Sequence, residues 1–245
     1  KMIGEMEEII ADLEDCDQRL ERVIQADVDV ELASNGTFSI WVSDSYPGDD
    51  AAHYSLFMQR KFDPGNATQI GYGTTIADEL SPHGEVHTYT FQGEVGDKVV
   101  LRMSENPGYP SNQVEPRLEV WGPDGDPVGA DFDNAQATVE CVLESTGIFS
   151  VWAGDSYPGD DAAHYSLFLQ RTFDPGMPIP ISFGETLNGT LSPNGDVDTY
   201  VFVGAAGDSV MIQLTESSGY PSNQMEPLAE LYSPDGDSLV HRSND

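Results

Sequence analysis

A tandem repeat without a gap is the feature that most constrains how this chain can fold. The segment SYPGDDAAHYSLF at 45–57 recurs unchanged at 156–168, an offset of 111 residues. Comparison of 25–134 with 136–245 at this offset gives 58 identities in 110 positions. The chain therefore contains two closely similar copies of one structural unit, preceded by a segment that has no counterpart in the repeat.

Each copy carries the pattern of short strands separated by turns. Segments rich in β-branched and aromatic residues alternate with turn sequences such as PGDD, VGD and GPDGD. These segments are 37–42, 54–59, 88–92, 98–103 and 117–121. Valine and threonine also alternate with other residues at 197–203, which is typical of a strand with one face covered. The pattern predicts an all-β fold made of tandem jelly-roll-like β-sandwiches in a 111-residue repeat.

Residues 1–24 follow a different pattern, with apolar residues spaced alternately by four and three positions. This spacing predicts a short amphipathic helix with an apolar seam that includes Ile9 and Leu13. The seam could pack on the same chain or pair with another subunit. The sequence leaves both alternatives open, and Ile9 and Leu13 are candidate interface residues.

The charge balance narrows the range of partners. The chain has 43 Asp and Glu against 10 Lys and Arg, a net charge of −33, so nucleic acid and anionic membranes are excluded as expected partners. No apolar run approaches the roughly 18 residues of a spanning helix, so membrane insertion is not expected. Cys16 and Cys141 fit neither a disulfide framework nor a zinc motif, which leaves their role open.

Several motifs together resemble a known family. ETLNGTLSPNGDVDTYVFVGAAGDSVMIQL at 185–214 and PLAELYSPDGD at 227–237 are similar to the first half of the bacterial pre-peptidase C-terminal domain. ATVECVLESTGIFSVWAGDSYPGDDAAHYSLFLQ at 137–170 resembles its second half. The resemblance implies a jelly-roll β-sandwich of the kind found on secreted and surface proteins, commonly as a non-catalytic appendage.

The resemblance also implies where a domain begins and ends within the repeat, and these boundaries divide the chain in an unusual way. Residues 1–24 form the helix, 25–62 the C-terminal half of a sandwich, 63–171 a complete sandwich, and 172–245 the N-terminal half of another. An open half-sandwich exposes an apolar face and unpaired strand edges, so both halves require a partner. The halves could close within one chain or between subunits, or the chain could be a piece of a longer tandem array.

Repeated linkers favour closure between subunits. RKFDPG at 60–65 and RTFDPG at 171–176 predict a similar rotation at both joints, and a general screw operation propagates into a filament. The sequence thus predicts an extracellular structural subunit that forms a head-to-tail homopolymer by completing a sandwich between neighbours. The alternative is a two-domain surface adhesin or binding module, closed within one chain, with a polysaccharide or cell-surface protein as ligand. In either case, contacts are expected at the repeated tyrosines Tyr46, Tyr109, Tyr157 and Tyr220.

No catalytic function is expected. Asp49, Asp50, His53 and Ser55 recur in the second copy, but no Gly-rich elbow surrounds the serine, and a turn followed by a strand start accounts for them.

Calcium is the metal that the sequence favours, since the resemblance places Asp196 and Asp198 at a pair of acids that lies near the metal in calcium-binding relatives. The first copy has Glu85 and His87 at these positions, and His is a poor calcium ligand. Three sequons, at Asn35, Asn66 and Asn188, predict N-linked glycans on an exported protein. The expected location is extracellular or on the cell surface.

Overall fold

The computed structural model describes residues 28–44, 54–81, 84–106, 114–156, 162–193, 195–216 and 227–243. The chain divides into two compact units, Lys1–Leu56 and Phe57–Asp245, and each is described by itself.

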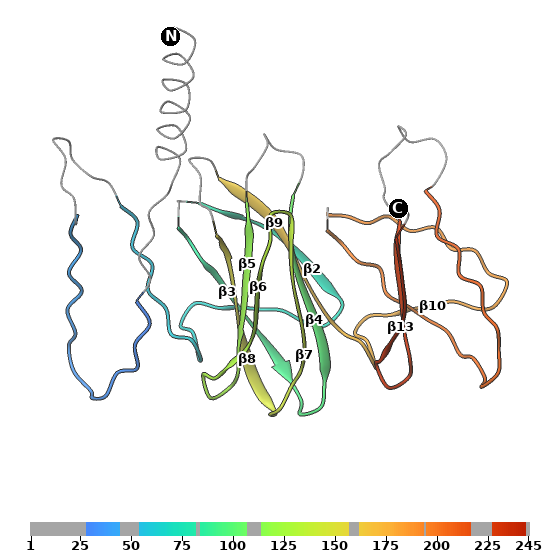
Figure 1. The fold of residues 1–245 in the computed structure, drawn as a ribbon, viewed down its shortest axis with the longest axis horizontal. Helices are drawn as coiled ribbons and strands as arrows, with labels where there is room; N and C mark the ends of the chain where they lie inside the picture. The colour runs from blue at the N-terminus through green and yellow to red at the C-terminus, as the bar shows by residue number, and fades with distance from the viewer. Residues whose placement is uncertain are drawn as a thin grey trace, which may run out of the picture. The chain divides into compact units, whose positions relative to one another are not determined.

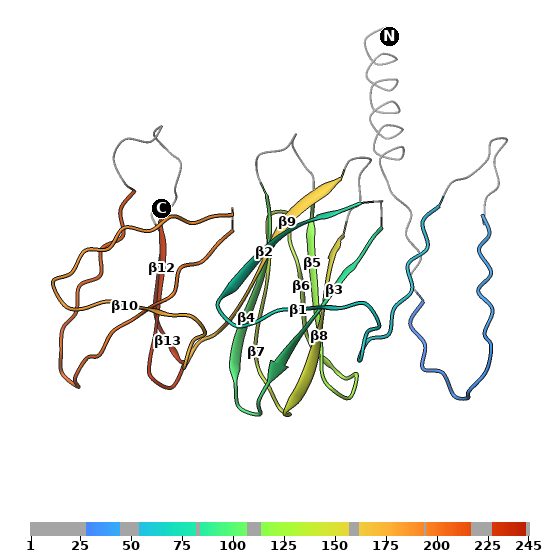
Figure 2. The same cartoon turned by 180° about the vertical axis from the view of Figure 1, so that it is seen from behind.

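The first copy's C-terminal part and the second copy's N-terminal part form a sandwich of two sheets (Figures 1 and 2). Its strands are β1 (Thr68–Gln69), β2 (Thr74–Leu80), β3 (His87–Gly93), β4 (Lys98–Glu105), β5 (Pro116–Trp121), β6 (Pro127–Phe132), β7 (Gln136–Val142), β8 (Gly147–Asp155) and β9 (Ala163–Arg171). One sheet has the order β1-β3-β8-β5-β6, and the other has the order β2-β9-β4-β7. The prediction of an all-β sandwich is confirmed.

The core of this sandwich lies between the two sheets. Alternate residues of β4 and β9, such as Leu101 and Leu167, point inward and are buried, together with Phe91 of β3 and Phe149 of β8. The rings of Phe91 and Phe149 stack with centroids 5.2 Å apart. The pleat thus converts the period-2 sequence pattern into one continuous apolar layer.

The described residues of 177–243 form four further strands in two small sheets. These strands are β10 (Ile179–Pro180), β11 (Tyr200–Val201), β12 (Leu228–Tyr232) and β13 (Ser238–Ser243). β10 pairs with β11, and β12 pairs with β13. Their registers are those of β1 with β3 and of β5 with β6, moved by the repeat offset, and even the irregularity between Leu231 and Tyr232 repeats that between Val120 and Trp121.

Some strands expected from the sequence are absent from the described residues. Residues 37–42 and 54–59 form no strand, and within 197–203 only Tyr200–Val201 does. The physical reason is pairing, because a strand exists only where a neighbour accepts its backbone hydrogen bonds. The equivalent residues of the complete sandwich lie in strands that are paired along their whole length.

Candidate assembly site: two incomplete half-sandwiches

Among the described residues of 177–243, referred to below as the half-sandwich, no segment pairs in the way that β7, β8 and β9 pair in the complete sandwich. In the complete sandwich β8 lies between β3 and β5, and β9 lies between β2 and β4. The equivalents of β2 and β4, residues 185–191 and 209–216, therefore have no such neighbour within 177–243, and they form no strand. The two strand pairs that form, β10 with β11 and β12 with β13, are equivalent to pairs that do not involve β7, β8 or β9.

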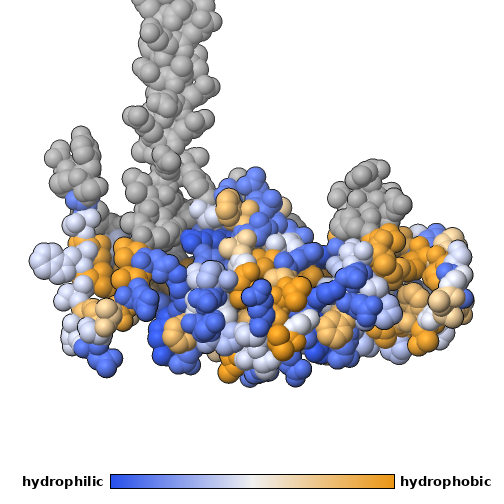
Figure 3. Space-filling model, turned by 60° about the horizontal axis from the view of Figure 1, so that its bottom comes forward, coloured by the Kyte–Doolittle hydropathy of each residue, from blue (hydrophilic) through white to orange (hydrophobic). Residues whose placement is uncertain are grey.

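The missing strands leave an apolar surface open in this half. Ile212 is 56% exposed, whereas its equivalent Leu101 is fully buried in the complete sandwich. Val210 and Leu214 are likewise exposed, although their equivalents, Val99 and Met103, are buried. Figure 3 shows this part of the surface at the right-hand end, where hydrophobic residues gather. Each Leu or Val side chain that becomes buried stabilises an assembly by about 1.5–3 kcal/mol.

Residues 28–60 contain segments equivalent to the three strands that have no counterpart among the described residues of 177–243. Residues 28–31, 36–44 and 54–60 are equivalent to parts of β7, β8 and β9. Their inward-facing positions are apolar and exposed: Phe38 is 51% exposed, whereas its equivalent Phe149 is 1% exposed. The other exposed positions in these segments include Val28, Val30, Ile40, Leu56 and Met58.

A polar joint holds the half-sandwich 177–243 on the outer face of the four-stranded sheet. Arg102 of β4 donates a hydrogen bond to Glu230 of β12 over 2.6 Å, and both side chains are largely buried. Lys98 donates to the Asp237 carboxylate over 2.5 Å, and Gln170 of β9 donates to the Thr199 hydroxyl over 3.1 Å. Outward-facing residues of β4 and β9 are thereby covered.

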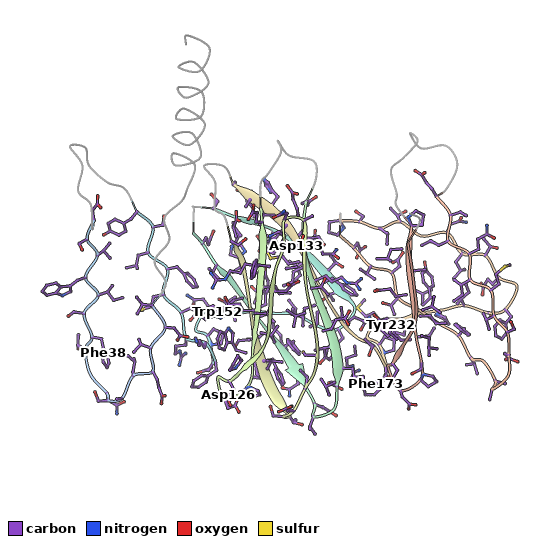
Figure 4. The ribbon with its side chains drawn as sticks, viewed as in Figure 1. Phe38, Asp126, Asp133, Trp152, Phe173 and Tyr232 are labelled. Atoms are coloured by element: carbon purple, nitrogen blue, oxygen red, sulfur yellow. The ribbon has the colours of Figure 1, made fainter. Side chains whose placement is uncertain are left out.

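The linker that precedes β1 lies on the other sheet. The ring of Phe57 meets Trp152 of β8 edge to face, with centroids 6.2 Å apart. The Lys61 ammonium lies 4.0 Å from the ring centroid of Trp121 on β5. Both tryptophans alternate with core residues, so they lie on the outer face of the five-stranded sheet. In Figure 4 the labels of Trp152 and Tyr232 stand on either side of the central sandwich.

The candidate calcium ligands lie near each other but are engaged with protein groups. Asp196 accepts hydrogen bonds from the Thr75 hydroxyl over 2.6 Å and from the Ser192 backbone over 3.0 Å. Desolvation, together with the negative charge of Asp196, raises the pKa of the Asp198 carboxyl above its usual range. No group of three or more His, Cys, Asp or Glu within the described residues is placed to hold a metal ion. Calcium at Asp196 and Asp198 stays a prediction.

The other candidate residues divide into exposed positions and positions outside the described residues. Asn35, Asn66 and Asn188 are all exposed, as a glycan requires, and their occupancy stays a prediction. Ile9, Leu13 and the repeated tyrosines Tyr46, Tyr109, Tyr157 and Tyr220 lie outside the described residues.

The sequence reasoning missed the residues of the polar joint. Arg102, Lys98 and Glu230 had no evident role because nothing in a single copy shows which strands face a neighbour. One signal was present: Lys98 and Arg102 differ from their second-copy equivalents, Ser209 and Gln213, although most of the surrounding turns are identical.

Comparison with known proteins places no family name on the chain. No family model and no curated protein matches it. Among solved structures, the pre-peptidase C-terminal domain of a collagenase from Bacillus anthracis is 14% identical, with 44% of this chain and 97% of that chain covered and a TM-score of 0.37. PliG, a periplasmic inhibitor of g-type lysozyme from Aeromonas hydrophila, is 12% identical, with 43% and 95% covered and a TM-score of 0.33. Both similarities span less than half of the chain.

In the described residues, no helix has the length and apolar character needed to cross a bilayer.

Proposed function

We propose that this protein is a structural subunit that binds further copies of itself by strand complementation. The segments of 25–62 in one copy would enter the half-sandwich of 177–245 in another copy, at the positions of β7, β8 and β9. Each copy would donate one half and accept one half, so the association would propagate head to tail.

The complete sandwich supports this proposal because it already contains the required pairing between closely similar sequences. β8 pairs with β3 from His87–Ala153 to Gly93–Gly147. At the repeat offset, the same register would pair residues 36–42 with residues 198–204. Phe38 would then lie beside Phe202, as Phe149 lies beside Phe91. This shared register is the observation on which the proposal rests.

The attachment points of the linkers support association between copies over closure within one. Phe57 and Lys61 contact the outer face of the five-stranded sheet, whereas the second half-sandwich contacts the outer face of the four-stranded sheet. The two faces are separated by the full thickness of a sandwich, whose sheets alone lie about 10 Å apart. Closure within one copy would have to break one of these two sets of contacts.

An exterior location accompanies the proposal. The net charge of −33 and the three exposed sequons, at Asn35, Asn66 and Asn188, suit a secreted or surface protein. Subunits this acidic repel one another beyond about 8 Å only weakly at physiological ionic strength, so short-range strand pairing can dominate.

Disulfide trapping tests the proposed register. In a background with Cys16→Ser and Cys141→Val, we expect Ser39→Cys with Val201→Cys to crosslink, because their equivalents Ser150 and Thr90 are cross-strand partners. Such partners have Cα atoms about 4.5–5.5 Å apart, within the range of a disulfide. On non-reducing gels the product should be a ladder of covalent multimers, and electron microscopy should show filaments.

A register-shifted pair provides the matched control. Ser39→Cys with Val203→Cys places the thiols on diagonal neighbours, roughly 7–8 Å apart, and should not crosslink. Thr37→Cys with Val203→Cys restores direct opposition, as for Ile148 with Gln92, and should crosslink again. A monomer with an internal disulfide, or no crosslinking by either directly opposed pair, would reject the proposal.

A further inference from the structure

The joint between the complete sandwich and the half-sandwich 177–243 has a second occurrence in the chain. At the in-chain joint, Gly236 packs against Phe173 and Thr172 of the linker that follows β9. Gly125, the equivalent of Gly236, packs in the same way against Phe62 of the linker that precedes β1. The same turn thus meets the same linker residue on both sides of the complete sandwich.

At this second joint, the described residues supply the acidic side chains but not the strand that would face them. At the in-chain joint, β4 supplies Lys98 and Arg102 to Asp237 and Glu230. At the second joint, Glu119 lies on the outer face of the five-stranded sheet and Asp126 lies in the turn between β5 and β6. The equivalent of β4, residues 209–216, lies on the other side of the sandwich. Under the proposed function, a preceding copy brings its own residues 209–216 to this place.

The Lys and Arg residues at the two joints all belong to the first copy. Seven of the ten Lys and Arg lie in the repeats, and for the four that are located at the joints the second-copy equivalent is neutral. These are Lys98 and Arg102, with Ser209 and Gln213 as equivalents, and Lys61 and Arg117, with Thr172 and Leu228 as equivalents.

Arg117 pairs with Glu119 at the second joint, as Arg102 of the facing sheet pairs with the equivalent Glu230 at the in-chain joint. Its guanidinium lies 2.6 Å from the carboxylate of Glu119, whose side chain is only 15% exposed. The equivalent Glu230 has Leu228 in place of that arginine and is paired instead with Arg102, from the facing sheet. A largely buried carboxylate needs one cation, and each joint has one in a different strand.

We infer that the outer face of the five-stranded sheet is a docking surface for a preceding copy, in which Gln213 faces Glu119 and Ser209 faces Asp126. The inference rests on the proposed function and adds a sheet-face contact to the strand complementation. Arg117 and Lys61 supply the positive charge that the incoming strand lacks. The joint between copies thus has the same arrangement as the joint within a copy, except that its cations lie on the same surface as the carboxylates, at the five-stranded sheet.

A double-mutant cycle across the joint tests this inference, with the critical concentration for assembly measured by sedimentation. Arg117→Leu should raise it at least tenfold, because Glu119 then meets a neutral glutamine. Gln213→Arg alone should change it less than threefold. The double variant has the wild-type net charge and the residues of the in-chain joint, so it should return to within threefold of wild type.

The same exchange inside one chain is the control. Arg102→Gln should lower the melting temperature, and adding Leu228→Arg should restore most of the loss, whether or not the protein assembles. The inference would be overturned if all variants assembled and Gln213→Arg did not lower the critical concentration of Arg117→Leu. That result would not contradict strand complementation. Failure of the wild type to assemble would remove the proposed function and this inference together.

Discussion

Phe57 meets Trp152 edge to face, at an interplanar angle of 86°, at the place where the linker reaches the five-stranded sheet. Both residues recur in the other copy, as Phe168 and Trp41. Phe168 lies on the outer face of β9, and the side chain of Trp41 is 93% exposed. In the proposed assembly, Trp41 of the next copy would complete the half-sandwich that packs on the outer face of β9 and would lie against Phe168. Trp41 is therefore a reporter of assembly.

We expect the fluorescence of Trp41 to shift to shorter wavelength when the protein assembles, because its indole leaves water. The signal is obtained as the difference between wild type and Trp41→Phe. Trp152→Phe is the matched control, since Trp152 already contacts Phe57 within the chain. An unchanged Trp41 spectrum in assembled protein would contradict the strand positions proposed above.

Deletion of residues 25–62 should abolish self-association while one sandwich remains folded. The deleted segment contributes no strand to β1–β9. Because the half-sandwich 177–245 is retained, this variant should also accept a donor and stop growth when added to wild type. Electron microscopy of mixtures should show filaments that shorten as the fraction of the variant rises, and filaments of the variant alone would contradict the proposal.

Two equivalent tyrosines should respond differently to loss of the hydroxyl. Tyr165 is buried, and its hydroxyl lies 2.5 Å from that of Tyr89 and 2.8 Å from Nδ1 of His87. Tyr165→Phe should therefore lower the free energy of unfolding by about 1–3 kcal/mol. Tyr54 is exposed, so Tyr54→Phe should leave the melting temperature of unassembled protein unchanged and weaken only assembly. Equal effects of the two substitutions on melting would contradict this assignment.

The substitution Asp198→Asn should raise the melting temperature without calcium and lower it, relative to wild type, with calcium. Burial and the charge of Asp196 raise its pKa in the folded state, so the protonated form is favoured by folding. Its contribution to stability is present at low pH and is lost as the pH rises through the raised pKa. Without calcium, Asp198→Asn should therefore raise the melting temperature at neutral pH and flatten its dependence on pH near the carboxyl range.

Millimolar calcium should raise the melting temperature of wild type and have little effect on Asp198→Asn. A ligand at a hundredfold excess over Kd contributes about 2.7 kcal/mol to the free energy of unfolding. Wild-type melting curves that coincide in calcium and in chelator would reject the site.

The N-terminal helix prediction can be tested through its apolar seam. Replacing Ile9 and Leu13 together by Asp should weaken association between subunits, because an apolar seam requires a partner outside the repeat. The β-sheet circular dichroism should persist. Cooperative loss of the sheet signal would show instead that the seam packs in a sandwich core.

The strand segments at 88–92, 98–103 and 117–121 and their inward-facing positions were predictable from sequence. Alternation places Leu101 and Phe149 on the core face whatever the neighbours are, since successive side chains of a strand point to opposite faces. The repeat offset alone equates Phe38 with Phe149 and Ile212 with Leu101. The sequence by itself thus determined which face of each strand must be buried.

Which strands actually form, and what lies against their outer faces, was decided only by the tertiary structure. Residues 37–42 have the composition of a strand but no partner within the described residues, and backbone hydrogen bonding needs two chain segments. The pairing of Arg102 with Glu230 joins residues 128 positions apart, across two sheets that meet through their outer faces. Local sequence encodes the periodicity of one strand, whereas a joint depends on the distance between groups that only the folded chain brings together.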